Sequence, residues 1–174
     1  TYWEYNDVRI NQLSLALLHL FRQPLPDVFL QTILQPLGGG EGLRWEGYDD
    51  AWTDIVDASG TKRRVQSVPG GTHWGGGVSI SARDQARVAE WMRTGGVRGV
   101  GGEPIVSAQW LARIAAPCAI PPFGASTQAS FMIGAGGHYI WIEPAHDAVV
   151  VVRWLDSAHA PGFIERMAVA LSQH

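Results

Sequence analysis

The spacing of apolar residues predicts a helix at the start of the chain. Between Asp7 and Arg22, apolar residues recur every three or four positions, and further leucines fill the opposite side. This period is that of a helix, and a helix that is apolar on most sides is buried. Asn6 or Asp7 can cap the first turn, and Pro24 has no N–H with which to continue the helix. We therefore expect a mostly buried helix over residues 7–22.

Shorter segments with other periods follow. Residues 41–70 mix aromatic and β-branched residues with turn residues, which is typical of short strands joined by a hairpin. The turn of this hairpin is expected at residues 57–60, which read Asp-Ala-Ser-Gly. Apolar period and start and stop signals predict four more helices, over about 27–34, 81–93, 107–115 and 163–171.

The last third changes to the period of a strand. Residues 139–143 and 148–155 are rich in β-branched and aromatic residues and flank a turn at 144–147, so we expect a β-hairpin. The four valines at 149–152 do not alternate with polar residues, which predicts a strand buried on both faces. The expected fold class is therefore α/β in its α+β form, an antiparallel sheet flanked by helices. No internal linker divides residues 1–174, so one domain is expected.

Composition narrows the class of protein. With 174 residues, 46% of them hydrophobic and 17% charged, the chain is long and apolar enough for a folded core. A net charge of −3 without a dense basic cluster gives no reason to expect a nucleic-acid partner. The single cysteine cannot form an internal disulfide, and we expect neither a metal site nor a cofactor. No apolar run reaches the roughly 20 residues of a membrane span.

Glycine and tryptophan are the unusual residues, with 21 and 8 copies. Glycine clusters mark places where the backbone turns with positive φ or closely approaches another group. Tryptophans mostly fill cores and rims, and those beside glycine loops can wall a pocket.

Tyr5, in the segment Tyr5-Asn6-Asp7 before the first helix, is the first candidate for chemistry. A phenol has a pKa near 10 and is a poor base at neutral pH, but a helix N-terminus and nearby cations favour the phenolate. The alternative is a core tyrosine beside an ordinary aspartate cap. These residues alone favour the alternative.

The glycine-rich segment 131–137, which is expected to be a loop running into the hairpin, is the second candidate. Here the backbone N–H groups of Gly134, Ala135 and Gly136 can face a developing oxyanion, which is a strong source of transition-state stabilisation. The alternative is a plain turn into a strand. His138 follows the segment and can reach a pocket, although a structural histidine is the default.

The third candidate is His73-Trp74, which is followed by three glycines. It superficially matches the oxyanion signal of lipase-like α/β-hydrolases, but that fold also needs a Gly-x-Ser-x-Gly elbow, which the chain lacks. His73 can still reach a pocket beside its glycines.

Several of these pieces follow one another in a characteristic order. Tyr5-Asn6-Asp7 opens a helix, Pro36-Leu37-Gly38 follows a second one, and residues 76–86 read Gly-Gly-Val-Ser-Ile-Ser-Ala-Arg-Asp-Gln-Ala. A glycine-rich turn then enters a strand that ends at Pro144, and a valine-rich strand and a helix finish the chain. In this order the chain resembles the β-lactamase superfamily of penicillin-recognising serine hydrolases, specifically its class C-like esterase and amidase branch. The resemblance spans nearly all of the chain.

The resemblance implies the C-terminal portion of a single β-lactamase- or transpeptidase-like domain. It implies acyl transfer, in which a serine attacks a carbonyl while a lysine one helical turn later and the motif tyrosine move protons. Tyr5 inherits the acid/base role, and Asp7 belongs to the same site. The serine and lysine are expected in an N-terminal portion of the same protein, so this chain alone should be inactive. A small ester, amide or β-lactam-like molecule is the expected substrate.

Two departures from the family pattern leave a second function open. Asp7 stands where the family usually has asparagine, and Met132-Ile133-Gly134 lacks the cation that would bind a β-lactam carboxylate. These departures motivate the alternative of a non-catalytic relative with a tryptophan-lined binding cleft. A weaker alternative is an independent carbohydrate-binding module.

One motif imitates the nucleophile. Ser59-Gly60-Thr61-Lys62 has the form Ser-x-x-Lys, but the chemistry needs serine at a helix N-terminus with lysine one turn later. Because the preceding residues signal a turn within strand-like sequence, we expect a surface hairpin here.

Overall fold

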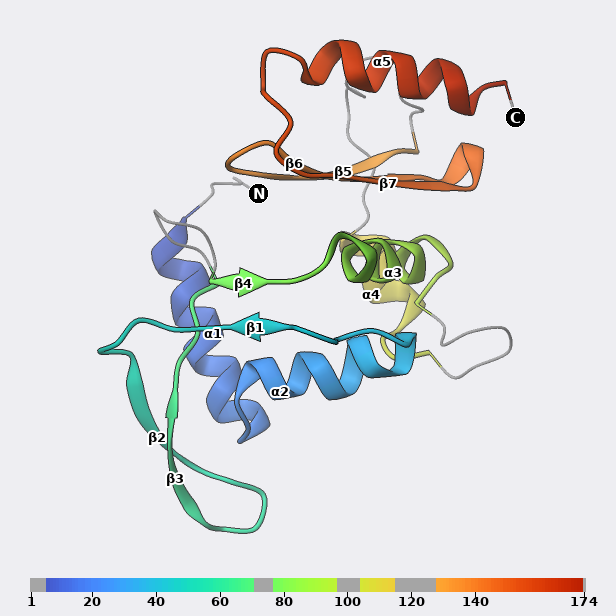
Figure 1. Cartoon of the computed structure of the whole chain (residues 1–174). Helices are drawn as coiled ribbons and strands as arrows, with labels where there is room; N and C mark the ends of the chain where they lie inside the picture. The colour runs from blue at the N-terminus through green and yellow to red at the C-terminus, as the bar shows by residue number, and fades with distance from the viewer. Residues whose placement is uncertain (1–5, 71–76, 97–103, 115–127, 174) are drawn as a thin grey trace. The chain divides into compact units, whose positions relative to one another are not determined.

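The computed structural model describes residues 6–70, 77–96, 104–114 and 128–173 (Figure 1). The chain divides into two compact units, residues 1–81 and 82–174. Both combine helices with small antiparallel sheets, so the chain is of the α+β type. None of the described helices is long and apolar enough to cross a bilayer.

The first helix has the predicted bounds and cap. Helix α1 runs over Asp7–Phe21, and the backbone N–H of Arg9 donates to Oδ1 of Asn6 at 3.0 Å. This bond satisfies one of the donors that the first turn of a helix leaves without a partner. The helix ends where Arg22 adopts the left-handed conformation, with φ of 55°. The predicted helix over residues 7–22 is therefore confirmed.

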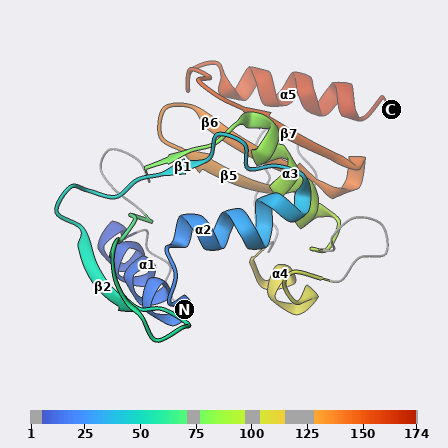
Figure 2. The same ribbon diagram turned by 60° about the horizontal axis from the view of Figure 1, so that its bottom comes forward.

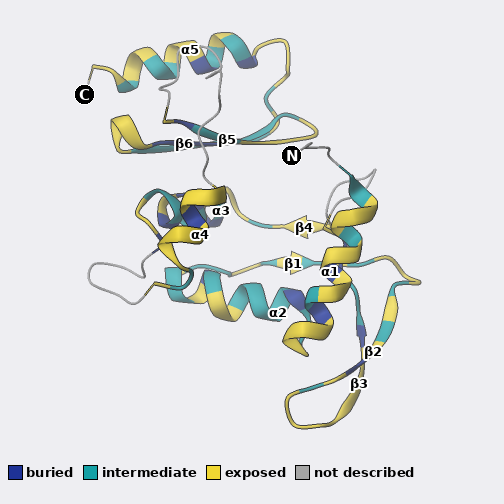
Figure 3. Cartoon of the chain, turned by 180° about the vertical axis from the view of Figure 1, so that it is seen from behind, coloured by how far each residue is buried: buried dark blue, intermediate teal, exposed yellow. Residues whose placement is uncertain are grey.

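The prediction that α1 is mostly buried is wrong in the described part of the chain. Only Ser14 and Leu18 are buried, whereas apolar side chains elsewhere along the helix are exposed, as the yellow positions in Figure 3 show. Leu18 packs with Ile55 and Val65 of the following hairpin, which lies alongside the helix (Figure 2). The apolar residues encircle α1, but the hairpin covers only one side of it. The exposed apolar residues of α1 are Val8, Ile10, Leu13, Leu15, Leu20 and Phe21.

The second helix begins two residues earlier than predicted and changes its hydrogen-bond spacing. It comprises α2 (Leu25–Phe29), the π-helical η1 (Leu30–Leu34) and the 3₁₀-helical η2 (Gln35–Leu37). It ends at Leu37, three residues after the predicted end, and Gly38 follows with φ of 73°.

Short antiparallel strands complete the first unit. Strand β1 (Arg44–Trp45) pairs with β4 (Val78–Ser79), and β2 (Trp52–Val56) pairs with β3 (Lys62–Gln66). The β2–β3 pair confirms the predicted hairpin.

The Ser-x-x-Lys sequence Ser59–Lys62 begins in the turn of this hairpin. The Asp57 carboxylate accepts hydrogen bonds from the backbone N–H groups of Ser59 and Thr61 and from the Ser59 hydroxyl. The hydrogen bond from Ser59 is the main reason that the pKa of Asp57 lies below its ordinary value. Lys62 bonds to Asp54 across the strands at 2.9 Å. As the sequence predicted, Ser59 therefore lies in an exposed turn and does not begin a helix.

Two helices open the second unit, both close to their predicted bounds. Helix α3 covers Ala82–Arg93, and α4 covers Ala108–Ile114. Gly95 and Gly96, which follow α3, both have positive φ. Ser107 caps α4, since its hydroxyl oxygen accepts from the backbone N–H of Trp110 at 3.2 Å.

The sheet of the second unit has one strand more than the sequence predicted. Strands β6 (His138–Glu143) and β7 (Ala148–Val152) form the predicted hairpin, and β5 (Ser130–Gly134) pairs antiparallel with β6. The expected glycine loop over 131–137 is thus wrong for its first four residues. They pair with β6 as a strand, and Phe131 lies opposite the buried Trp141 and packs against the same cluster.

Helices cover both faces of this sheet. Helix α5 (Ala160–Leu171), which begins three residues before its predicted start, lies on one face, and α3 packs on β6 and β7 from the other (Figure 1). Trp141 of β6 is 1% exposed and packs against Ile164 of α5. The valines of β7 are half-buried, which is less than predicted. An antiparallel sheet flanked by helices is therefore present in this unit.

Candidate functional site

The turn between β5 and β6 brings the predicted substrate-binding glycines next to a distant segment of the chain. It comprises Ala135, Gly136 and Gly137, and both glycines have φ near +80°. The backbone N–H of Leu155 donates to the carbonyl oxygen of Gly137 at 3.0 Å. A Cβ atom at position 137 would overlap the Leu155 carbonyl oxygen, so only glycine fits there. The turn is thereby fixed to the chain that follows β7.

His138 and Trp154 meet at this turn. Their ring centroids are 4.6 Å apart and the ring planes are inclined by 74°, which is an edge-to-face contact. Trp154 is 77% exposed. Its backbone lies in the left-handed region, with φ of 62°. That conformation costs a non-glycine residue on the order of 1 to 2 kcal/mol. Nδ1 of His138 is buried, and no described group forms a hydrogen bond with it.

A pocket of about 240 Å³ opens beside the turn, on the face of the sheet toward α3. Gln85 of α3 contributes an amide and His138 contributes an imidazole, while most of the remaining wall is apolar. None of the described residues that line it carries a permanent charge. The chemistry of the wall therefore suits a small neutral group with an apolar part. The lining residues are Gln85, Met132, Ile133, Gly134, His138, Tyr139, Ile140 and Val152.

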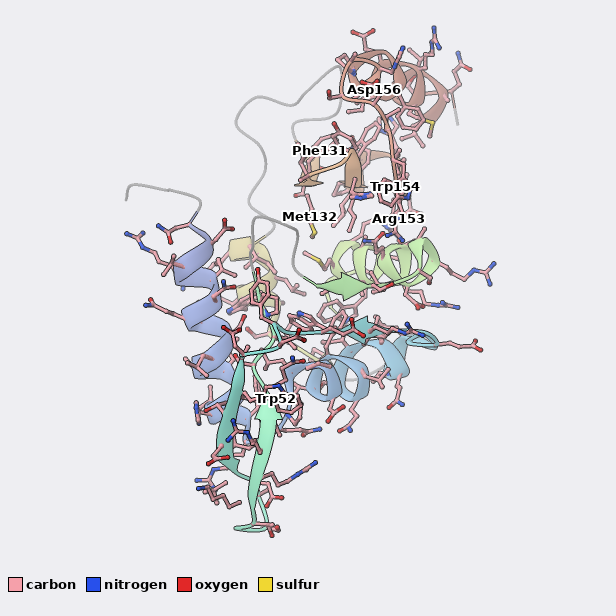
Figure 4. All side chains as sticks on the ribbon, turned by 60° about the vertical axis from the view of Figure 1, so that its left-hand side comes forward. Trp52, Phe131, Met132, Arg153, Trp154 and Asp156 are labelled. Carbon is pink, nitrogen blue, oxygen red and sulfur yellow. The ribbon has the colours of Figure 1, made fainter. Side chains whose placement is uncertain are left out.

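The alternation along β5 separates this pocket from the core. Phe131 stacks on Trp141 at a centroid distance of 5.4 Å on the side of α5, whereas Met132 points to the opposite side and is 40% exposed (Figure 4). Met132 therefore contributes its thioether to the wall of the pocket.

An ion pair anchors α3 to the sheet that it covers. Arg93 in the last turn of α3 forms ion pairs with Glu90 and with Asp147 in the turn between β6 and β7. The hydrogen bond from Arg93 holds the pKa of Glu90 below its ordinary value. The Arg93–Asp147 ion pair holds α3, which carries Gln85, against the β6–β7 turn.

Asp7 lies in the other unit, as the first residue of α1. A carboxylate is favoured there by the partial positive charge of the helix N-terminus. Its Oδ1 atom is buried, and no donor from the described residues reaches it. A buried acceptor without a partner costs roughly 1 to 3 kcal/mol, so the described residues leave this oxygen with an unmet need for a donor.

The remaining predicted site residues are Tyr5, His73 and Trp74, which lie outside the described residues. The structure places Gly134 and His138 in the wall of one pocket, and Ala135 and Gly136 lie in the turn that joins them. No group of three or more histidine, cysteine, aspartate or glutamate side chains in the described ranges could hold a metal ion.

Sequence reasoning missed Gln85 and Trp154 at this site. The signal for Trp154 was the register of the hairpin, in which Tyr139 pairs with Val152, so that the residue two places after Val152 falls opposite Gly137. That register depends on the 3₁₀ turn η4 (Pro144–His146), whose shape the sequence did not define. Gln85 carries no local signal, because only the packing of α3 on the sheet brings it to the pocket.

A scan of known protein families finds none that matches the chain, and a search of curated proteins finds no relative.

Proposed function

We propose that the chain is the C-terminal portion of a serine hydrolase of the β-lactamase superfamily, in its class C-like esterase and amidase branch. In this proposal Tyr5 is the acid/base group, and the nucleophilic serine and its lysine come from sequence outside residues 1–174. The serine oxygen attacks the substrate carbonyl and gives up its proton to the base. The leaving group receives a proton, and water then hydrolyses the acyl-serine ester.

The unpaired Oδ1 atom of Asp7 is the observation that carries this proposal. A buried carboxylate oxygen needs a donor, and a lysine ammonium or a serine hydroxyl from outside the described residues would supply one. Because Asp7 follows Tyr5 by two positions, their α-carbons are at most roughly 7 Å apart. In the proposal, the donor that pairs with Asp7 also exchanges a proton with the phenol of Tyr5.

The glycine turn supports the substrate-binding part of the proposal. Gly134, Ala135 and Gly136 lie at the end of β5 and in an exposed turn, where backbone N–H groups can bind a carbonyl oxygen that gains negative charge. The pocket beside them has no cationic wall among the described residues. The proposal therefore favours neutral esters and amides over substrates with a β-lactam carboxylate.

The alternative is a non-catalytic relative that uses the same fold for binding. Met132 in the pocket wall, at the place of the family's cation, favours this reading, as does the exposed ring of Trp154 beside the turn. Both features serve binding of an apolar ligand without any chemistry.

A fluorophosphonate probe tests the hydrolase on the protein that carries this chain together with its upstream sequence. The probe should label a serine upstream of Thr1, and the protein should hydrolyse 4-nitrophenyl acetate. The substitution Tyr5→Phe should lower kcat about 10²- to 10⁴-fold, because it removes the acid/base hydroxyl. Tyr48→Phe is the matched control, since Tyr48 is an exposed tyrosine in the same unit, and it should leave kcat unchanged.

Two results would contradict the proposal in different ways. Labelling of residues 1–174 alone, at Ser59 for example, would place the nucleophile inside the chain. A longer protein that folds but takes up no probe would favour the non-catalytic binding protein.

A further inference from the structure

We propose that Trp154 and His138 form an aromatic platform that makes the pocket at the β5–β6 turn selective for a neutral group with an aryl ring. The inference deepens the proposed function, and it rests on that proposal for the interpretation of this pocket as part of a substrate site. Three features carry it: the chemistry of the pocket wall, the fixed position of Trp154, and the absence of charge among the described residues of the lining.

The pocket wall suits a flat apolar group. Met132 and Ile140 contribute polarizable and aliphatic surface to it, and thioethers pack well against aromatic rings. Gln85 adds one amide that can donate to, or accept from, a polar group on the same ligand. A volume of about 240 Å³ is small for a ligand pocket, so it accepts one ring or a short branched chain and not a whole extended substrate.

Trp154 lies beside His138, which lines this pocket. Leu155, the residue after Trp154, donates its backbone N–H to the Gly137 carbonyl oxygen. The Trp154 ring contacts the imidazole of His138. The nearest ring atom lies 3.9 Å from the Cβ position of Gly136, so the indole also packs along the turn. Most of the ring is exposed, which leaves it free to stack on a ligand.

The charge of the wall selects against ions. An ionised ligand would leave water without gaining a counter-charge from any described lining residue, and such a burial is strongly unfavourable. A neutral arylacetamide gains aromatic stacking and one hydrogen bond, whereas an arylacetate gains the stacking and pays for desolvation of its carboxylate.

Methyl-detected NMR on the intact protein, with phenylacetamide as the probe, tests this inference. Phenylacetamide should shift the methyl signals of Met132 and Ile140, and it should bind about tenfold more tightly than propanamide, which lacks the ring. Phenylacetate should also bind about tenfold more weakly than the amide. Trp154→Ala should weaken phenylacetamide binding about tenfold, and Trp154→Phe should retain most of the affinity because it keeps an aromatic face.

Trp52→Ala is the matched control, because Trp52 is an exposed tryptophan in the β2–β3 hairpin. It should leave binding unchanged. The inference is overturned if phenylacetamide leaves both methyl signals in place, or if Trp154→Ala and Trp154→Phe bind it equally well. Binding that requires the ring and Trp154 in a protein that takes up no fluorophosphonate would support the platform and reject only the hydrolase.

Discussion

The carbonyl oxygen of Leu155 occupies the space in which a side chain at Gly137 would begin. This close approach joins the β5–β6 turn to the segment after β7, and it places Trp154 against His138. The arrangement of the candidate pocket thus depends on the lack of one methyl group.

Gly137→Ala should destabilise the second unit by about 3 kcal/mol or more, because it adds a backbone clash to the strain of a positive φ. Gly95→Ala is the control, since Gly95 has φ of 81° and nothing within 4 Å of its Cβ position. It should cost only about 1 kcal/mol, from strain alone. Urea denaturation of both variants measures the difference, and equal losses would show that the Leu155 contact is relaxed in solution.

Arg93→Gln should lower stability at neutral pH and make little difference in acid. Arg93 depresses the pKa of Glu90 in the folded state, so this stabilisation is fully present above the ordinary pKa of 4.5. It is lost as the pH falls through the lower pKa of the folded state. Because the Glu90 carboxylate is half exposed, we expect a loss of only about 0.5 to 1 kcal/mol at pH 7.

Denaturation curves of wild type and Arg93→Gln between pH 2 and pH 8 measure this effect. Arg166→Gln, an exposed change on α5, should shift stability by less than about 0.5 kcal/mol. A deficit in Arg93→Gln that persists unchanged at pH 2 would contradict the electrostatic explanation.

Leu18→Ala and Leu20→Ala should differ strongly although both lie in the last part of α1. Leu18 is 1% exposed and packs with Ile55 and Val65, so its truncation should cost about 2 to 4 kcal/mol. Leu20 is 72% exposed, and its truncation should change the stability of residues 1–174 by less than about 0.5 kcal/mol.

The same pair of variants reports on the apolar residues that α1 exposes. If an N-terminal portion covers them, Leu20→Ala should cost about 1 kcal/mol or more in the longer protein. An unchanged stability in both proteins would show that this part of α1 remains in water.

Arg22→Gly should stabilise the first unit by roughly 0.5 to 1 kcal/mol, because Arg22 ends α1 in the left-handed conformation that glycine adopts without strain. Arg22→Ala keeps the strain and should give no gain. A thermal melt of the two variants distinguishes release of strain from loss of the arginine side chain.

Much of the fold was predictable where the signal is local. The cap at Asn6 and the turn at Asp57 each depend on neighbouring residues, and both appear where expected. The burial of α1 was not predictable, because apolar residues around a whole helix show that it can be covered and do not show which segment covers it.

The candidate site divides in the same way. Glycines 134 and 136 and His138 were identified from one short segment. Gln85 reaches the pocket only through helix packing, and Trp154 contacts His138 only through the hairpin register. Strand β5 was mistaken for a loop because Gly134 ends it and two further glycines, Gly136 and Gly137, follow in the turn. The parts of the site that could not be predicted are therefore those formed by contacts between distant segments of the chain.

The helix formed by α2, η1 and η2 has one further consequence. At η1 the N–H of Gln35 bonds to the carbonyl of Leu30, five residues back, where an ordinary α-helix would use four. Such a widened turn holds one residue more than a regular helix of the same rise. The chain can therefore lose a single residue between Leu30 and Leu34 and still connect Leu25 to Gly38, so this helix is a place where the length of the protein can change by one without a change of fold.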